Sequence, residues 1–293
     1  MVRKKSKGER IFGVFNVILM VFLLFVTLYP MYYVLVCSLS DGNQLIGARG
    51  IMVIPKGFDV SSYKAVINNP NILTGFRTTL IVVVCGTIIS VVMTAIGAFL
   101  VTRNGFWLKK PLSYLMVFTM YFGGGMIPTF LVVNNILHMG NNLLALILPG
   151  AISVYNLLIM KSNFEALPRS LEEAAYIDGA NDITLLFKIV LPLSKSVIAV
   201  MVLFYGVSYW NAWFDAMVYI RDREMYPLQL ILREILLQNS TNSMNSSSVG
   251  EQYAIGESIK YATIMVATVP ILVIYPFVQK YFVTGVMIGA VKG

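Results

Sequence analysis

Residues 11–38 read IFGVFNVILMVFLLFVTLYPMYYVLVCS, a long apolar run without a single charged side chain. A helix of about 20 apolar residues crosses the roughly 30 Å hydrocarbon core of a bilayer, so this run is long enough to span one. The basic start MVRKKSKGER resembles that of a secretory signal peptide, but the run exceeds a signal core of about 7–15 residues and contains no small-x-small cleavage site. The stretch therefore predicts a retained first transmembrane helix.

The rest of the chain has the same apolar character. Hydrophobic residues make up 57% of the 293 residues and charged residues only 12%, with a mean hydropathy of +0.75. Such a chain has too little polar surface to cover a soluble globule, and its apolar runs lack the polar–apolar alternation of barrel strands. We therefore predict an all-α polytopic membrane protein with a single domain over residues 1–293. About six spans are expected, at approximately 11–38, 78–101, 112–137, 143–161, 196–220 and 259–282.

The distribution of basic residues predicts the orientation of these spans. The net charge of +8 comes from Lys and Arg in short blocks beside apolar runs, which is typical of membrane topology and argues against a nucleic-acid partner. With the N-terminus in the cytoplasm, that side carries roughly twice as many Lys and Arg residues as the other. Both termini and the polar segment 162–195 are therefore expected in the cytoplasm.

The predicted spans contain few groups that could support ion coupling or catalysis. Asp215 is the main ionisable side chain within them, and Cys37, Cys85 and the single His138 form neither a disulfide nor a metal pattern. No G-x-x-x-x-G-K-[ST] phosphate loop is present, so the chain lacks this means of binding ATP. We predict no catalytic residue, no metal site and no bound cofactor. Sodium coupling through backbone carbonyls stays open.

Two further segments allow more than one structure or role. Gly123–Gly125 lies inside a predicted span with Pro128 close behind it, which favours close helix packing or a loosened helix, with a hinge or a pore-facing break as the alternative. Long outer connections at 39–77 and 221–258 could receive an external partner. Within the second, the Ser/Asn-rich run 239–250 predicts a flexible surface loop.

The polar segment 165–195 reads EALPRSLEEAAYIDGANDITLLFKIVLPLSK and follows the rules of helix starts and stops. Ser170 and Glu173 have the spacing of a capping box, and Gly179 is a typical helix stop. Asn181 offers a second N-cap, and Pro192 is expected to end the helix that follows. The segment therefore predicts two short helices joined by a turn on the cytoplasmic face.

The spacing within this segment resembles the EAA loop of ABC importer permeases. Glu173-Ala174-Ala175, then Gly179, then Ile189-Val190-Leu191-Pro192 match the defining positions of that pattern. In that family the first short helix is the coupling helix, which docks in a cleft of the ATPase subunit. The resemblance implies an ATPase-coupling role for Glu172, Glu173, Ala174, Ala175, Asp178, Gly179 and Ala180.

The similarity extends over nearly the whole chain. It includes YFGGGMIPTFLVV (121–133), LALILPGAISVYNLLIMKSNF (144–164), YWNAWFDAMVYI (209–220), YPLQLILREIL (226–236) and the C-terminal YPFVQKYFVTGVMIGAVKG. These stretches resemble carbohydrate-uptake permeases, most closely the branch that moves large oligosaccharides and polysaccharides, and within it the six-span partner of a permease heterodimer.

This resemblance implies the type I importer transmembrane fold, in a bacterial cytoplasmic membrane. It also implies a complex with a homologous second permease, two ABC ATPase subunits that use ATP and Mg²⁺, and an extracytoplasmic solute-binding protein. The substrate would be an oligosaccharide or polysaccharide.

A sugar pathway would combine aromatic faces with amides and carboxylates, because these groups stack on pyranose rings and bind hydroxyls. A dense cluster of this kind lies in the fifth predicted span, where Tyr209 and Trp213 would share one helical face and Asn211 and Asp215 another. An interfacial aromatic belt is the competing interpretation. The pathway candidates are Tyr205, Tyr209, Trp210, Asn211, Trp213, Asp215 and Asn156, with Asn134 and Asn135 as weaker ones.

Two rival functions agree less well with the sequence. A secondary carrier or channel for a polar solute would need polar, broken helices around a midplane site, and the EAA spacing argues against it. A membrane-embedded enzyme would need a constellation such as H-E-x-x-H or paired carboxylates, which one histidine makes improbable.

Overall fold

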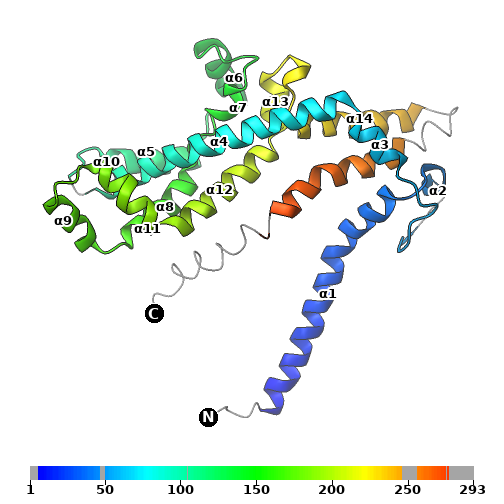
Figure 1. Ribbon diagram of the computed structural model, residues 1–293, viewed down its shortest axis with the longest axis horizontal. Coiled ribbons are helices and arrows are strands. Elements are labelled where there is room, and N and C mark those ends of the chain that lie inside the picture. The colour runs from blue at the N-terminus through cyan, green and yellow to red at the C-terminus, as the bar shows by residue number, and fades with distance from the viewer. Residues whose placement is uncertain (1–5, 47–49, 104, 246–255, 275, 277–293) are drawn as a thin grey trace. The chain divides into compact units, whose positions relative to one another are not determined.

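The computed structural model describes residues 6–46, 50–103, 105–245, 256–274 and 276 (Figure 1). These residues form helices and one isolated β-bridge, Ser40 to Phe58, and no strand. The all-α prediction is therefore confirmed. The chain divides into two compact units: the first combines the residues up to Asn69 with Glu234–Thr268, and the second combines Pro70–Arg233 with the residues from Val269 onward.

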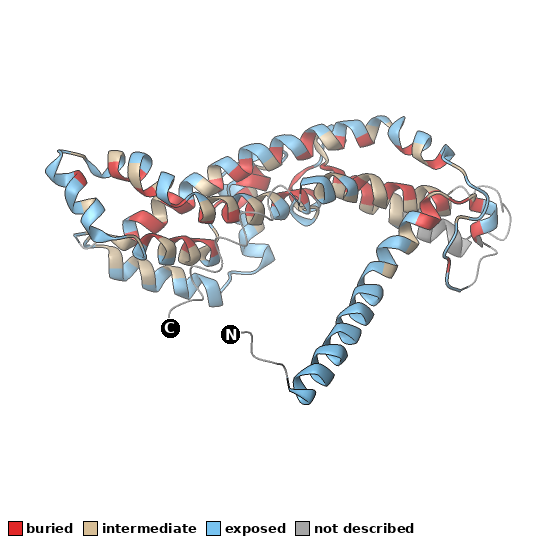
Figure 2. Ribbon diagram, turned by 60° about the horizontal axis from the view of Figure 1, so that its bottom comes forward, coloured by how far each residue is buried: buried red, intermediate tan, exposed pale blue. Residues whose placement is uncertain are grey.

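The longest element of the first unit is α1 (Lys7–Ser38), a 32-residue helix. A capping box starts it, because Ser6 Oγ accepts from Glu9 N at 3.2 Å and Ser6 N donates to Glu9 Oε2 at 2.8 Å. The large apolar side chains of its first six turns are exposed (Figure 2), as expected for a helix whose surroundings are lipid. A helix long and apolar enough to cross a membrane therefore lies where the first span was predicted, and its retention stays a prediction.

The connection after α1 is shorter and more ordered than the sequence suggests. It contains α2 (Gly42–Ile46) and α3 (Ser61–Ile67), and α4 already begins at Pro70.

The prediction of a flexible loop at 239–250 is wrong for its first part, because α14 (Leu228–Asn245) continues through it, and the remainder lies outside the described residues. Adding one residue to a helix that has already formed is far easier than starting a helix, so a polar run can be helical when it follows one.

The second unit is built on three helices: α4 (Pro70–Thr102), α8 (Val154–Glu165) and α12 (Lys195–Trp210). They lie side by side (Figure 1), and buried residues gather along the faces they share (Figure 2). Helices in a bilayer gain little from the hydrophobic effect, so close approach and interhelical hydrogen bonds must hold them together.

Small and hydroxyl residues of α4 provide that close approach. A Cβ at Gly86 would lie within 3.0 Å of three ring atoms of Tyr209, so only glycine leaves room for this ring. One turn further, Ser90 Oγ lies 2.8 Å from the Tyr209 hydroxyl, and Thr94 Oγ1 lies 2.7 Å from the hydroxyl of Tyr205. These two buried hydrogen bonds join α4 to α12.

The third predicted span, 112–137, is not one helix. It is divided into α5 (Lys109–Tyr121), α6 (Met126–Leu131) and the π-helical turn η1 (Val132–Ile136), with a bend of 118° at the glycines. Gly125 has φ +84°, and a Cβ at Gly123 or Gly125 would meet nothing within 4 Å. The glycines therefore break the helix, as in the alternative interpretation, and within the described chain they do not provide the close packing that was one of the two favoured interpretations.

The fourth predicted span, 143–161, is also discontinuous. It consists of α7 (Leu144–Ile147), a turn and α8. The 12 residues of α8 extend about 18 Å, well short of a roughly 30 Å hydrocarbon core. Mean hydropathy is high over this segment, but hydropathy carries no information about helix continuity.

The fifth predicted span, 196–220, is interrupted near its end. α12 stops at Trp210 and α13 (Phe214–Tyr219) follows after a short break. Tyr209 and Trp213 therefore do not share a helical face, and neither do Asn211 and Asp215, contrary to the expectation for a continuous helix.

Three described helices are long and apolar enough to cross a membrane: α1, α4 and Gly256–Ile274. Two bent pairs bring the number to five if each counts as one span: Lys109–Tyr121 with Met126–Ile136, and Asp182–Leu193 with Lys195–Trp210, which meet at 86°. The described part of the chain thus contains three to five candidate spans. The last predicted span, 259–282, is described as a helix as far as Ile274.

Candidate functional site: the short helices α9 and α10 and the α8–α12 cavity

The first of the two predicted short helices is α9 (Arg169–Ile177). It begins two residues earlier than predicted: Pro168, with extended backbone, is the N-cap in place of Ser170, and no side chain caps the helix. The capping box at Ser170 was therefore wrong, because Ser170 already lies inside the first turn.

Gly179 ends α9 as predicted, with φ +81°. The amide of Gly179 donates to Tyr176 O at 3.0 Å, and the amide of Ala180 donates to Ala175 O at 2.9 Å. This pair of bonds is a Schellman motif, which requires a left-handed residue at the position of Gly179. The motif sets the direction in which the chain leaves the helix.

The second short helix is α10 (Asp182–Leu185), which continues through the π-helical turn η2 (Leu186–Val190) into α11 (Leu191–Leu193). Asn181 caps it as predicted, accepting from Thr184 N at 2.8 Å. Pro192 lies inside α11 and does not end the helix before it. The π-turn immediately precedes this proline, which cannot donate a backbone hydrogen bond of its own.

The predicted coupling residues do not all face the same way. Glu173, Ala174, Asp178 and Gly179 are exposed, whereas Glu172 and Ala180 are half-buried and Ala175 is buried in the core of the second unit. No sequence pattern singled out Ile177, whose side chain is 86% exposed on the same helix. An exposed isoleucine on a polar helix is a candidate contact for a partner.

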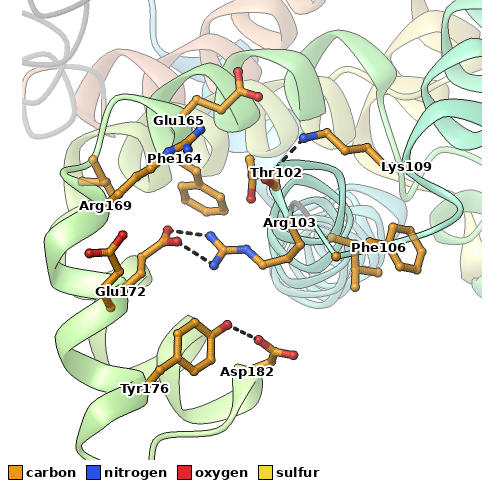
Figure 3. A pocket seen from close by; sticks show the side chains of 14 residues that line it. Thr102, Arg103, Phe106, Lys109, Phe164, Glu165, Arg169, Glu172, Tyr176 and Asp182 are labelled. Atoms are coloured by element: carbon orange, nitrogen blue, oxygen red, sulfur yellow. Dashed lines mark hydrogen bonds and ion pairs between the residues drawn. The ribbon is translucent and has the colours of Figure 1, made fainter.

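Arg103 joins α9 to the C-terminal end of α4. Its guanidinium binds both carboxylate oxygens of Glu172, at 2.6 and 2.8 Å (Figure 3). It also lies 4.3 Å from the ring centre of Phe99. Burial disfavours the charged guanidinium, but the hydrogen bonds and charge of Glu172 outweigh this, and the pKa of Arg103 is raised. The pair borders a cavity of about 680 Å³ that is also lined by Lys109 and Arg169.

A second contact stiffens the turn between the two short helices. The Tyr176 hydroxyl donates to Asp182 Oδ1 at 2.6 Å (Figure 3). This hydrogen bond and partial burial raise the pKa of Tyr176, so the phenol stays protonated at neutral pH. α9 and α10 are therefore linked by side chains as well as by the Gly179 turn.

The aromatic cluster of the fifth predicted span lines a different cavity, of about 620 Å³, between α8 and α12. Asn156, Tyr205, Tyr209 and Asp215 all contribute to its wall. The two tyrosine hydroxyls are held in place, because that of Tyr209 donates to Ile147 O at 3.1 Å and that of Tyr205 accepts from Ser153 N at 3.0 Å. The wall thus combines aromatic rings with amide and carboxylate groups.

The remaining pathway candidates lie elsewhere. Trp210 is buried and packs edge-on against Phe76, with ring centres 5.7 Å apart. The Asn211 amide donates to Val207 O of its own helix at 2.9 Å, and the guanidinium of Arg233 stacks on Trp213 at 3.9 Å from the ring centre. None of these three side chains lines the cavity.

The weaker candidates near the end of the broken third span are also separate from that cavity. Asn134 Nδ2 donates to Asn135 Oδ1 at 2.8 Å, and Asn134 lines a small polar pocket of about 250 Å³ with His138. No group of three or more potential metal ligands occurs among the residues that the structure describes.

Residues 93–288 match the family described as "Binding-protein-dependent transport system inner membrane component". The match includes α9, the Gly179 turn, and every residue of the α8–α12 cavity named above. The chain belongs to this family. It is the permease component of an ABC importer, a transport subunit and not an enzyme, and its family works with an ATPase and a solute-binding protein.

Two curated relatives of this permease come from Bacillus subtilis (strain 168). The polygalacturonan/rhamnogalacturonan transport system permease protein YtcP is 40% identical over 90% of this chain and 92% of its own length. Protein LplC is 38% identical over 98% of this chain and 97% of its own.

A solved structure has a similar fold. It is a chain of a bacterial ABC transporter involved in the import of the acidic polysaccharide alginate. The two chains superpose with a TM-score of 0.85 and are 30% identical, over 96% of this chain and all of the other. The permease fold predicted from the EAA spacing is confirmed.

Proposed function

We propose that this permease imports an oligosaccharide or polysaccharide, using the exposed face of α9 to receive force from an ATPase subunit. The observation that carries the proposal is the combination of this face, shaped by the Gly179 turn, with membership of the importer family. The saccharide class is supported by relatives named for polygalacturonan, rhamnogalacturonan and arabinooligosaccharides, and by the alginate importer.

The proposed complex contains a second, homologous permease, two ATPase subunits and an extracytoplasmic solute-binding protein. ATP and Mg²⁺ are used by the ATPase subunits, and this chain binds no cofactor. Both termini and the segment from α9 to α11 face the cytoplasm, in keeping with the distribution of Lys and Arg. Closure of the ATPase pair moves α9, and the pathway alternates between inward and outward openings.

Within this proposal, α9 contacts the ATPase through Glu173, Ala174, Asp178 and Gly179. These residues are exposed, and the small side chains allow a partner surface to approach closely. Ala175 and Ala180 hold the helix in place, because both pack against the core of the second unit.

Reconstitution tests the proposed function directly. The permease, its partner permease, ATPase and binding protein are placed in liposomes, and ATP hydrolysis and uptake are measured with oligogalacturonate, alginate oligomers and arabino-oligosaccharides as probes. We expect at least one saccharide to stimulate hydrolysis and to enter the vesicles, and Glu173→Arg to remove the stimulation. Uptake that proceeds without the ATPase, or that is unchanged in the Glu173→Arg variant, would contradict the proposal.

The α8–α12 cavity is the proposed saccharide contact. Asn156→Ala removes an amide from its wall and Asp215→Asn removes a negative charge. We expect each to lower uptake at limiting saccharide by roughly tenfold, since one such hydrogen bond contributes about 0.5–1.5 kcal/mol and more to a charged group. Asn211→Ala is the matched control, because its amide bonds its own helix and does not line the cavity. Equal effects at Asn156 and Asn211 would rule out a special role for the cavity.

A further inference from the structure

The two parallel bonds between the Arg103 guanidinium and the Glu172 carboxylate form an ion pair that we call the fork. The importer mechanism described above does not use it. Both nitrogen–oxygen contacts are short, and the two side chains are only 15% and 22% exposed. Arg103 follows directly after α4, and the ring of Phe99 lies against its guanidinium. A planar guanidinium bound to both oxygens of a carboxylate fixes orientation as well as distance.

This contact turns Glu172 away from the surface that would meet an ATPase. Glu173, its neighbour, is exposed, whereas Glu172 points toward the end of α4 (Figure 3). Ala175 is the buried residue of α9, and it is too small to hold the helix firmly by packing alone. The Arg103–Glu172 pair therefore supplies a directional link between α9 and a long transmembrane helix.

The same long helix reaches the cavity through its hydrogen bonds. Ser90 and Thr94, about two to four turns before Arg103, bind the hydroxyls of Tyr209 and Tyr205, which line the α8–α12 cavity. A continuous set of contacts thus runs from α9 through α4 to the cavity wall, all within the second unit.

We propose that Arg103 is a positioning residue that couples α9 to α4, so that movement of the ATPase-facing helix is transmitted to the saccharide cavity. The proposal rests on the proposed function and adds a specific link to it. Glu172 acts inside the permease as the partner of Arg103, and Glu173 and its exposed neighbours act outside it. Lysine cannot replace Arg103 fully, because an ammonium group cannot make the two parallel bonds.

The test compares uptake per ATP hydrolysed with assembly of the complete transporter in liposomes. We expect Arg103→Gln and Glu172→Gln to retain the bound ATPase and to lower saccharide uptake per ATP by about tenfold or more. The exchanged pair, Arg103→Glu with Glu172→Arg, should recover uptake per ATP to within about threefold of wild type. Lys109→Gln removes a cation from the same cavity without touching the fork, and should leave the ratio unchanged.

Several outcomes would overturn the proposal. Single variants with wild-type uptake per ATP, or an exchanged pair no better than the single variants, would show that the fork does not carry the coupling. If Arg103→Gln prevents assembly, Arg103→Lys decides: an assembled but uncoupled complex supports the proposal, and normal coupling overturns it. Failure of the wild-type complex to import any saccharide would instead contradict the proposed function.

Discussion

Gly179→Val is expected to abolish saccharide-stimulated ATP hydrolysis in the reconstituted transporter, with a loss of at least about tenfold. Gly179 has φ +81°, and holding a β-branched residue there costs on the order of 1–3 kcal/mol. The backbone can relieve this strain by opening the Schellman motif. The chain then leaves α9 in another direction, and the exposed residues of the helix move. Stimulated hydrolysis and co-purification of the ATPase are the measurements.

A substitution series at this position separates backbone geometry from side-chain contact. Asparagine adopts the left-handed conformation more readily than alanine, so Gly179→Asn should retain more activity than Gly179→Ala. No atom lies within 4 Å of a Cβ at this position, so a larger side chain meets no obstacle within the chain itself. If Gly179→Val were as active as wild type, the turn would not be part of the coupling surface.

Gly86→Ala is expected to destabilise the permease by about 1–3 kcal/mol, the usual cost of overfilling a packed interior. The added methyl group would lie within 3.0 Å of three ring atoms of Tyr209. That ring cannot easily move aside, because its hydroxyl is held by Ser90 and by Ile147 O. Thermal unfolding of the purified protein in detergent and the yield of assembled transporter measure the effect.

The α4–α12 contact also offers a matched control for this change. A Cβ at Gly206 of α12 would lie 3.7 Å from Thr87 Oγ1, which is an ordinary contact, so Gly206→Ala should be tolerated. Gly86→Ala should cost less stability in a Tyr209→Val background than in the wild-type protein, because the ring with which the methyl group clashes is absent there. Equal melting temperatures for the Gly86 and Gly206 variants would refute the packing argument.

The features that the sequence predicted correctly depend on nearby residues. An unbroken apolar run is enough to predict α1 and α4, since a helix satisfies its own backbone within the segment. Gly179 and Asn181 were recognised as a helix stop and an N-cap because their partners lie within a few residues in the chain. The spacing from Glu173 to Pro192 is a local pattern as well, and it was sufficient to predict the permease family.

The errors in the predicted spans came from treating apolarity as evidence of a continuous helix. Hydropathy averages over a window, so it could not distinguish an intact helix from the bend at Gly123–Gly125 or the stop at Trp210. The stop of α12 at Trp210 also bears on the saccharide cavity. Tyr205, Tyr209 and Asp215 line its wall, whereas Trp213 does not and stacks with Arg233 instead.

The sequence by itself determined the all-helical membrane fold, the two short helices and the family, because each depends on residues close together in the chain. Only the tertiary structure decided which face of α9 is exposed and which residues line the cavity. Arg103 and Glu172 lie 69 positions apart, and Ser90 and Tyr209 lie 119 apart. Their pairing depends on how the ends and faces of whole helices pack, and no local pattern in one sequence encodes that packing.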